Sequence, residues 1–250
     1  MKKQSEPAPL IGCAGWNIPR EAAAAFPMAG SHLERYGAVF PVVEINSSFY
    51  KPHQPKTYAR WADSVPDGFR FSVKVPRAIT HDAQMRDIGE LLARFAGEVK
   101  ELGHKLGCLL VQTPPKLGFH DATARDFFMQ LEDTFGCMIA CEGRHPSWFS
   151  DIATEVLRER QVTRVIADPA AGQAGPHVPT TNDVYMRLHG APRIYYSAYS
   201  QDYLDALVRD LEQHRAAGRR VWCIFDNTAA GEAVPNALEV LQATGSLVTA

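Results

Sequence analysis

Short apolar stretches recur along the chain in a pattern typical of buried β-strands. Most are rich in β-branched and aromatic residues, which favour strands. The eight stretches are LIGCAGW from Leu10, VVEINSSFY from Val42, RFSVKV from Arg70, CLLVQT from Cys108, MIACEGR from Met138, RVIADP from Arg164, VYMRLHG from Val184 and RVWCIFDN from Arg220.

Helical periodicity fills most of the intervals between these stretches. It is clearest over residues 83–106, where apolar residues recur at spacings of three and four. Shorter helical patterns cover 123–131, 152–160 and 203–217, and weaker ones cover 53–62 and 233–242. Alternating strands and helices predict a parallel sheet with helical crossovers. The economical α/β form at 250 residues is a closed (β/α)8 TIM barrel, with a doubly wound open sheet as the alternative.

The chain shows no change of composition that would mark a second domain. We expect a flexible N-terminal tail over residues 1–9 and a single TIM-barrel domain over residues 10–250. One unit departs from the pattern, because residues 170–183 are rich in Gly and Pro where a helix should follow the sixth strand. This composition predicts a modified, loop-like connection or lid after strand 6.

Polar residues stand near the C-terminal ends of several predicted strands. Since strand side chains alternate between two faces, Glu44, Asn46 and Tyr50 should share one face of the second strand. In the sixth strand, Asp168 shares a face with Ile166. In a barrel the charged faces point into the lumen, and the C-terminal ends form the mouth where active sites are built. The residues expected there are Glu44, Lys74, Glu142, Arg144, Asp168, Arg187 and His189.

Motifs in and after the same strands resemble those of a known family. The segments are IGCAGW, VVEINSSFY, FRFSVKVPRAITH, LLVQTPP, EGRHPSW, ADP, YMRLHG and FDNTAAGEAVPNA, in this order. On these segments, which span nearly the whole chain, the protein resembles the domain of unknown function 72 family, the YecE-like TIM barrels. Its departures from the family pattern include Gly143 and Asp226, which alter the mouth. The resemblance implies the barrel but supplies no reaction.

Acid–base chemistry is the first kind of reaction that this mouth suggests. Glu44, Glu142 and Asp168 would supply a base and an acid if their environments separate their pKa values. Lys74 or Arg187 would stabilise negative charge that develops on oxygen. The structural alternative is a layer of buried ion pairs that only fills the barrel.

A metal site is the second possibility for the mouth. His81, Glu142, His145, Asp168 and His189 are metal-ligand types, and TIM-barrel nucleases resembling endonuclease four gather such residues there. The candidate ligands are Glu142, Asp168 and His189. Lys74, Arg144 and Arg187 stand against this hypothesis, because cations on the same faces would repel a metal. The leading hypothesis requires no cofactor, although a divalent metal is possible.

Anion binding and aromatic stacking are further possibilities at the rim. Barrels often hold phosphate after strands seven and eight, where HGAPR and NTAAGEA lie, with Asn227 or Thr228 as a helix cap and Gly231 in the turn. An ordinary turn with an N-cap is the alternative. The aromatic residues expected at the rim, which would stack on a ligand or close the mouth, are Trp16, Phe49, Tyr50, Trp148, Tyr195 and Tyr196.

Composition narrows the partners and the compartment. The net charge of -2 does not favour nucleic acid, which remains possible, and no apolar run is long enough for a membrane helix or a signal peptide. The five cysteines form no CxxC pair, which favours free, buried thiols in a reducing compartment. We therefore expect a cytoplasmic protein with a small anionic ligand.

The leading hypothesis is a hydrolase or lyase that acts on a phosphorylated sugar or nucleotide. Arg144 and Arg187 would clamp the anion, since a guanidinium fits phosphate or carboxylate. The alternatives are a metal-dependent phosphodiesterase and a non-catalytic anion-binding or sensing module. The predicted catalytic residues are Glu44, Asn46, Lys74, Glu142, Asp168 and His189. The predicted ligand-binding residues are Trp16, Tyr50, His81, Gln112, Arg144, Trp148, Arg187 and Asn227.

Overall fold

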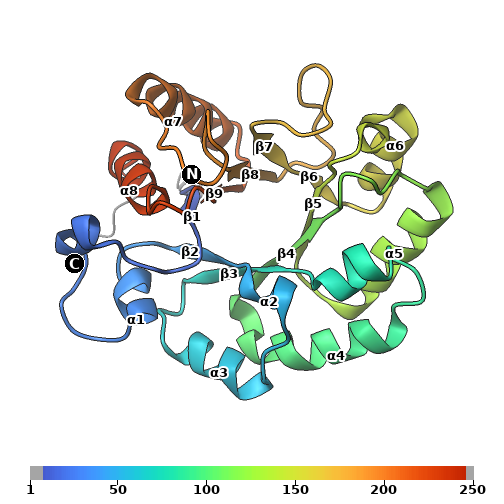
Figure 1. Ribbon diagram of the computed structural model, residues 1–250, viewed down its shortest axis with the longest axis horizontal. Helices are drawn as coiled ribbons and strands as arrows, with labels where there is room; N and C mark the ends of the chain where they lie inside the picture. Colours follow the sequence, from blue (N-terminus) through green and yellow to red (C-terminus); the bar gives the residue numbers. More distant parts are fainter. Residues whose placement is uncertain (1–7, 246–250) are drawn as a thin grey trace, which may run out of the picture.

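A ring of parallel strands forms the centre of the protein, and the helices lie outside it (Figure 1). The computed structural model describes residues 8–245, so the predicted flexible tail over residues 1–9 lies almost wholly outside the described residues. Over the described residues the strands are β1 (Leu10–Ala14), β2 (Val42–Ile45), β3 (Arg70–Lys74), β4 (Leu106–Gln112), β5 (Met138–Glu142), β6 (Thr163–Arg164), β7 (Ile166–Asp168), β8 (Val184–Leu188) and β9 (Val221–Phe225).

The ring closes through a single interrupted strand. The sheet order is β6-β5-β4-β3-β2-β1-β9-β8-β7, and every pairing is parallel. Its two end strands, β6 and β7, are consecutive pieces of one stretch with only Val165 between them. β6 pairs with β5, while β7 pairs with β8. The predicted TIM barrel is therefore confirmed, with its sixth strand split between two neighbours.

The helices broadly follow the predicted periodicity. They are η1 (Arg20–Ala25), α1 (His32–Gly37), α2 (Ser47–Tyr50), α3 (Pro55–Asp63), η2 (Ala78–Asp82), α4 (Gly89–Val99), η3 (Lys100–Lys105), α5 (Asp121–Thr134), η4 (Pro146–Phe149), α6 (Asp151–Glu159), α7 (Gln201–Ala216) and α8 (Ala233–Ala243). Residues 170–183 contain no helix, as their composition predicts. No helix between residues 8 and 245 has both the length and the apolar character needed to cross a membrane.

One predicted strand ends earlier than expected, and one predicted helix begins later. The second strand stops at Ile45, and the next turn is the helix α2. The helix expected from residue 83 begins only at Gly89, because Gln84, Met85 and Asp87 adopt positive φ angles that no α-helix accommodates. Apolar spacing continues through both breaks, so it does not reveal them.

The barrel interior is apolar toward the N-terminal ends of the strands, here called the lower end, and polar toward their C-terminal ends. Buried side chains that cluster inside the ring include Val42, Leu110, Val165, Tyr185 and Trp222. Near the lower end, Trp222 stacks on Tyr185 with ring centroids 6.0 Å apart. Above this apolar plug, the inward residues at the C-terminal ends of the strands are polar. The plug therefore supports a layer of charged groups and separates it from the lower end of the barrel.

A bulge in β4 lets the plug fit. The pairing of β3 with β4 shifts register between Phe71 and Ser72, which leaves Gly107 as an extra residue. A Cβ atom at Gly107 would lie 2.5 Å from Cη2 of Trp222. This close approach requires glycine.

We expect Gly107→Ala to lower the free energy of unfolding by about 1–3 kcal/mol, because the added methyl group overpacks the plug against Trp222. Urea unfolding followed by far-ultraviolet circular dichroism measures this change. Gly136→Ala is the matched control, since a Cβ atom there meets no atom within 4 Å. Equal effects of the two substitutions would contradict the packing explanation.

Candidate functional site

The guanidinium group of Arg187 is the centre of the polar layer. Its side chain is fully buried at the end of β8. Nε and Nη2 bind the two carboxylate oxygens of Glu44 at 3.0 and 2.7 Å. Nη1 donates to Oε2 of Glu142 at 2.5 Å, and Nη2 also donates to Oδ2 of Asp226 at 2.8 Å. One cation thus joins carboxylates from β2, from β5 and from the residue after β9.

These contacts determine the ionisation of the layer. Burial disfavours the charged form of Glu142, but the charge of Arg187 and the nearby His189 outweigh it and hold the Glu142 pKa well below its usual range. The same balance lowers the pKa of Asp226. For Arg187, burial is opposed by the three carboxylates, so its pKa lies above the ordinary value. The layer therefore holds fixed charges at neutral pH.

Neighbouring polar groups hold the carboxylates in place. Tyr185 donates its hydroxyl hydrogen to Oε2 of Glu44 at 2.8 Å, and Oγ of Ser72 lies 2.7 Å from the same hydroxyl. On the opposite side, Oε1 of Glu142 accepts from Nε2 of Gln112 at 3.0 Å and from Nε of Arg144 at 2.9 Å. With these partners, the carboxylates of Glu44 and Glu142 are already well supplied with hydrogen bonds.

His189 is the protonatable group of the layer. Its Nδ1 lies 3.0 Å from Oδ2 of Asp226, and its Nε2 lies 3.5 Å from Oε1 of Glu142. Burial alone would lower the His189 pKa, but the hydrogen bond to Asp226 and the carboxylate of Glu142 raise it above the ordinary value. Its Nε2 is buried and has no hydrogen-bond partner. A charged His189 therefore directs its Nε2 proton toward the carboxylate of Glu142.

Lys74 occupies a different position from the other cations. It ends β3 with 7% of its surface exposed, and its Nζ lies 4.4 Å from the centre of the Phe49 ring. Over residues 8–245, this Nζ makes no hydrogen bond or ion pair. Burial, with the repulsion of Arg187, lowers the Lys74 pKa to about 8, although nearby carboxylates oppose the change. A substantial fraction of the amine is therefore neutral near physiological pH.

The rim above this layer is built by side chains from separate loops. Arg144 has 21% of its side chain exposed, and its Nη2 lies 3.5 Å from the hydroxyl of Tyr195. Tyr195 packs its ring edge-on against His189 with a φ angle of 70°, an uncommon backbone conformation for a bulky residue. The backbone strain at Tyr195 is of a kind often found at functional sites.

His81 lies at the same rim. Its ring lies 4.9 Å from that of Phe49, and burial lowers the His81 pKa.

An open hollow lies beside the polar layer at the ends of β1 and β2. Its volume is about 390 Å³, and its walls include Trp16, His32, Glu44 and Asn46. Nδ2 of Asn46 lies 3.4 Å from Oδ1 of Asp226, while the buried Oδ1 of Asn46 has no partner. The predicted positions of Trp16 and Asn46 at the mouth thus agree with the structure.

The structure places Asp168 away from the charged layer, against the prediction. Its Oδ1 accepts a hydrogen bond from the hydroxyl of Tyr199 at 3.0 Å. Val165 and Ala167 belong to the inner cluster, whereas Ile166 packs against the outer core. Because Asp168 shares the face of Ile166, alternation already directed it outward, and the expected inward orientation is wrong.

The candidate metal ligands are consequently not brought together. Glu142 and His189 lie in the charged layer, whereas Asp168 hydrogen-bonds to Tyr199. Between residues 8 and 245, no group of three or more His, Cys, Asp or Glu side chains is arranged to hold a metal ion. The two carboxylates nearest to His189, those of Glu142 and Asp226, already bind Arg187.

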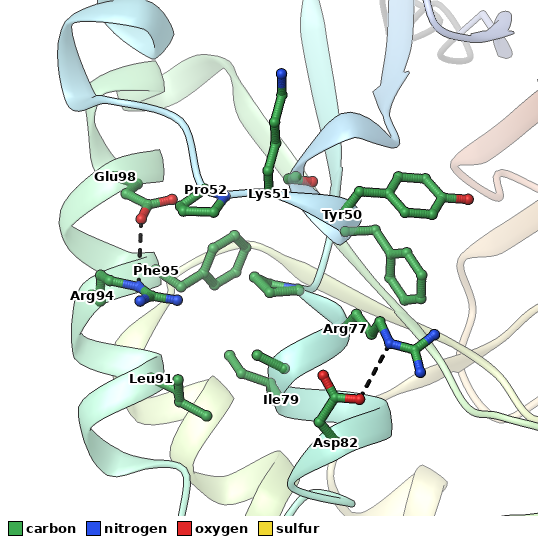
Figure 2. Close-up of a pocket in the computed structure, with 14 residues that line it drawn as sticks. Tyr50, Lys51, Pro52, Arg77, Ile79, Asp82, Leu91, Arg94, Phe95 and Glu98 are labelled. Carbon is green, nitrogen blue, oxygen red and sulfur yellow. Dashed lines mark hydrogen bonds and ion pairs between the residues drawn. The ribbon is translucent and has the colours of Figure 1, made fainter.

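Tyr50 and Trp148 do not point into the barrel. Tyr50 is 78% exposed, because α2 replaces the strand whose alternation would have turned it inward. Tyr50 lies at the edge of a pocket of about 120 Å³ between α2, η2 and α4. Figure 2 shows its side chain pointing away from Ile79 and Phe95, which line the same pocket. Trp148 is 2% exposed and donates from Nε1 to the carbonyl of Leu117. It packs in the outer core and does not face a ligand.

Asn227 has a structural position that differs from the predicted helix cap. It is fully buried, and its Nδ2 donates to the carbonyl of Ser197 and to Oδ1 of Asn236. The helix α8 begins at Ala233, with Glu232 as its N-cap residue. Asn227 therefore joins the loop after β8 to α8.

Two residues of the layer, Asp226 and Tyr185, were not among the predicted catalytic or ligand-binding residues, although Asp226 was expected to alter the mouth. Asp226 follows β9, and alternation from Trp222 through Ile224 would have directed it inward. Tyr185 shares the face of Arg187, so the same rule would have placed it below the charges. The periodic signal for both was present in the sequence.

We expect Arg187→Met to lower the free energy of unfolding at neutral pH by about 3–5 kcal/mol, since three carboxylates lose their shared cation. Pairing with Arg187 stabilises the ionised form of Glu142 and Asp226, whose folded pKa values are lowered from 4.5 and 3.8. This stabilisation is complete above those values and is lost as the pH falls through the folded pKa values. The deficit of the variant should therefore shrink on acidification below 4.5.

Urea unfolding of both proteins across this pH range measures the deficit. Arg209→Met, a change on the exposed surface of α7, is the control for the loss of one positive charge. A deficit that stays constant on acidification would contradict the role given to the Arg187 ion pairs.

Comparison with known proteins identifies relatives of this barrel. The family model described as "Protein of unknown function DUF72" matches residues 10–249. The UPF0759 protein YecE of Escherichia coli strain K12 is 29% identical over 189 residues, which cover 73% of this chain and 67% of that protein. The UPF0759 protein YunF of Bacillus subtilis strain 168 is 23% identical over an alignment 264 residues long, gaps included, which covers 93% of each protein.

Solved structures show the same fold. A DUF72 family protein from Thermotoga maritima has a TM-score of 0.77 at 24% identity, over 94% of this chain and 98% of that chain. One from Enterococcus faecalis has a TM-score of 0.77 at 22% identity, over 96% of this chain and 99% of that chain. The family match extends along almost the whole sequence and includes every barrel strand. The chain therefore belongs to the DUF72 family.

Proposed function

We propose that the barrel mouth is the active site of a hydrolase or lyase that acts on a small anionic ligand, such as a phosphorylated sugar or nucleotide. The observation that carries this proposal is the position of Lys74, a buried cation at the mouth without an ion-pair partner among residues 8–245. Buried charges ordinarily require a partner. A bound anion would provide one.

The anion would bind on the side of the mouth formed by β3 and β5. Lys74 would contact it as a point charge, and the partly exposed guanidinium of Arg144 would present its donors from the rim. Arg187 takes a different role from the predicted clamp. Its donors already bind three carboxylates, so it organises the layer below the ligand.

The pKa shifts favour Lys74 for proton transfer. The lowered pKa of Lys74 brings its amine closer to neutrality, where acid–base catalysis is most effective, whereas the raised pKa of His189 favours its charged form. Glu142, by contrast, is a poor base because Arg187, Gln112 and Arg144 already bind its carboxylate. In the proposed mechanism, Lys74 attracts the anion in its charged form and donates that proton to the ligand, which leaves the amine neutral.

We expect Lys74→Met and Arg144→Met each to weaken binding of a phosphorylated ligand about tenfold to a hundredfold, which corresponds to the loss of one charged hydrogen bond. A panel of sugar phosphates and nucleotides would be screened by thermal shift, and the hits measured by calorimetry with the variants. Arg209→Met should bind as the unchanged protein does.

Turnover of the bound hits, followed by phosphorus and proton NMR, separates an enzyme from a binding module. Tight binding without turnover would contradict the catalytic part of the proposal and favour an anion sensor. Equal binding by the Lys74, Arg144 and Arg209 variants would contradict the assignment of the mouth.

A further inference from the structure

Lys74 differs in the contacts of its amine from Lys105, the other lysine that is buried among residues 8–245. Nζ of Lys105 donates to the carbonyl oxygens of Ala62 and Val65 at 2.7 and 2.8 Å, which favours the ammonium form. Nζ of Lys74 has no such acceptor among residues 8–245, and its aromatic neighbour is Phe49. Lys74 also keeps 7% of its surface exposed.

The charges of the layer balance without a proton on Lys74. The three carboxylates are Glu44, Glu142 and Asp226. Arg187, Arg144 and a protonated His189 supply three positive charges within ion-pair distance of them. The neutral form of Lys74 therefore leaves no buried carboxylate without a cation.

From this geometry, and on the basis of the proposed function, we propose that Lys74 is a nucleophile that forms an imine with an aldehyde or ketone group of the anionic ligand. A free amine at the end of a barrel strand, with cations beside it for an anionic group, suits this substrate class. Desolvation in an apolar pocket is a known route to an activated lysine, and here Phe49 supplies the apolar surface.

The chemical step balances in atoms and in charge. The lone pair of neutral Nζ forms a bond to the carbonyl carbon, and the π electrons move to the carbonyl oxygen, which takes a proton from solvent. Nζ then releases a proton to solvent. A second protonation of the hydroxyl group expels water and leaves a protonated imine. Overall, one amine, one carbonyl group and one proton yield one iminium ion and one water.

Reductive trapping tests this inference. The protein would be incubated with glyceraldehyde 3-phosphate or with pyruvate in the presence of sodium cyanoborohydride, which reduces an iminium ion to a stable secondary amine. Peptide mass mapping then locates the adduct. With its pKa of about 8, Lys74 has a neutral fraction at neutral pH on the order of a hundredfold above that of an ordinary lysine. We expect the adduct on Lys74 at least about tenfold faster than on any other lysine.

The pH profile adds a second readout. Trapping at Lys74 should rise with pH up to about 8, as the amine loses its proton. The charged groups that influence it are Glu44 on β2, Glu142 on β5, Arg187 on β8 and Asp226 after β9. The charge of Lys74 in turn acts on His81 of η2. Surface lysines should continue to gain reactivity at higher pH.

Two variants and one ligand serve as controls. Lys74→Arg keeps the positive charge but forms no imine, so it should lose the specific adduct, whereas Lys51→Arg, at an exposed lysine, should retain it. If Lys74→Arg fails to fold, the map of the unchanged protein still decides. Glycerol 3-phosphate, which has no carbonyl group, should bind without any adduct.

The outcomes separate this inference from the proposed function. Adducts confined to surface lysines and the amino terminus would overturn the imine. If glyceraldehyde 3-phosphate and glycerol 3-phosphate also protect the protein equally from thermal unfolding, an anion site remains and only the covalent step is lost. Absence of both binding and adducts across phosphorylated and carboxylate ligands would overturn both proposals.

Discussion

The contact of one buried guanidinium with three carboxylates determines the organisation of the barrel mouth. Arg187 is fully buried, so its desolvation is offset only while Glu44, Glu142 and Asp226 surround it. These partners come from different parts of the ring, and their positions therefore require correct closure of the barrel. Hydrogen bonds from Tyr185 and Gln112 extend the arrangement outward. The arrangement of the mouth thus depends on an interaction within the protein itself.

The same contact separates a charge that is held ionised from groups whose pKa values lie closer to neutral pH or that have a free hydrogen-bonding atom. A cation with several anionic partners is held in its ionised form, as Arg187 is, and contributes little to proton transfer. Lys74 shares the electrostatic field of the carboxylates but has no directed partner among residues 8–245, so burial dominates its pKa. His189 lies between these extremes, because Asp226 holds one ring nitrogen and leaves the other unpartnered. Within one layer, differences in pairing therefore produce differences in protonation.

Much of this site could be predicted from alternation along the strands. Glu44, Glu142 and Arg187 were expected to point inward, and they do. The position of Tyr50 could not be predicted, since apolar residues continue past Ile45 while the backbone changes from strand to helix. Alternation also gives only the face of a side chain and not its partners, which is why Arg187 was expected to contact a ligand. The break at Val165 depends on closure between distant strands, which local patterns do not record.

The interrupted strand at Val165 also makes the barrel wall uneven. β6 and β7 are short, and each pairs with only one neighbour, so this part of the wall has fewer backbone hydrogen bonds than the long pairing of β4 with β5. The ion pair of Arg187 with Glu142 links β8 to β5 across this seam. The side chains of the mouth therefore connect two strands that the interrupted strand joins only weakly. The charged layer also holds the barrel closed, so a substitution in the layer should weaken strand pairing at Val165 as well.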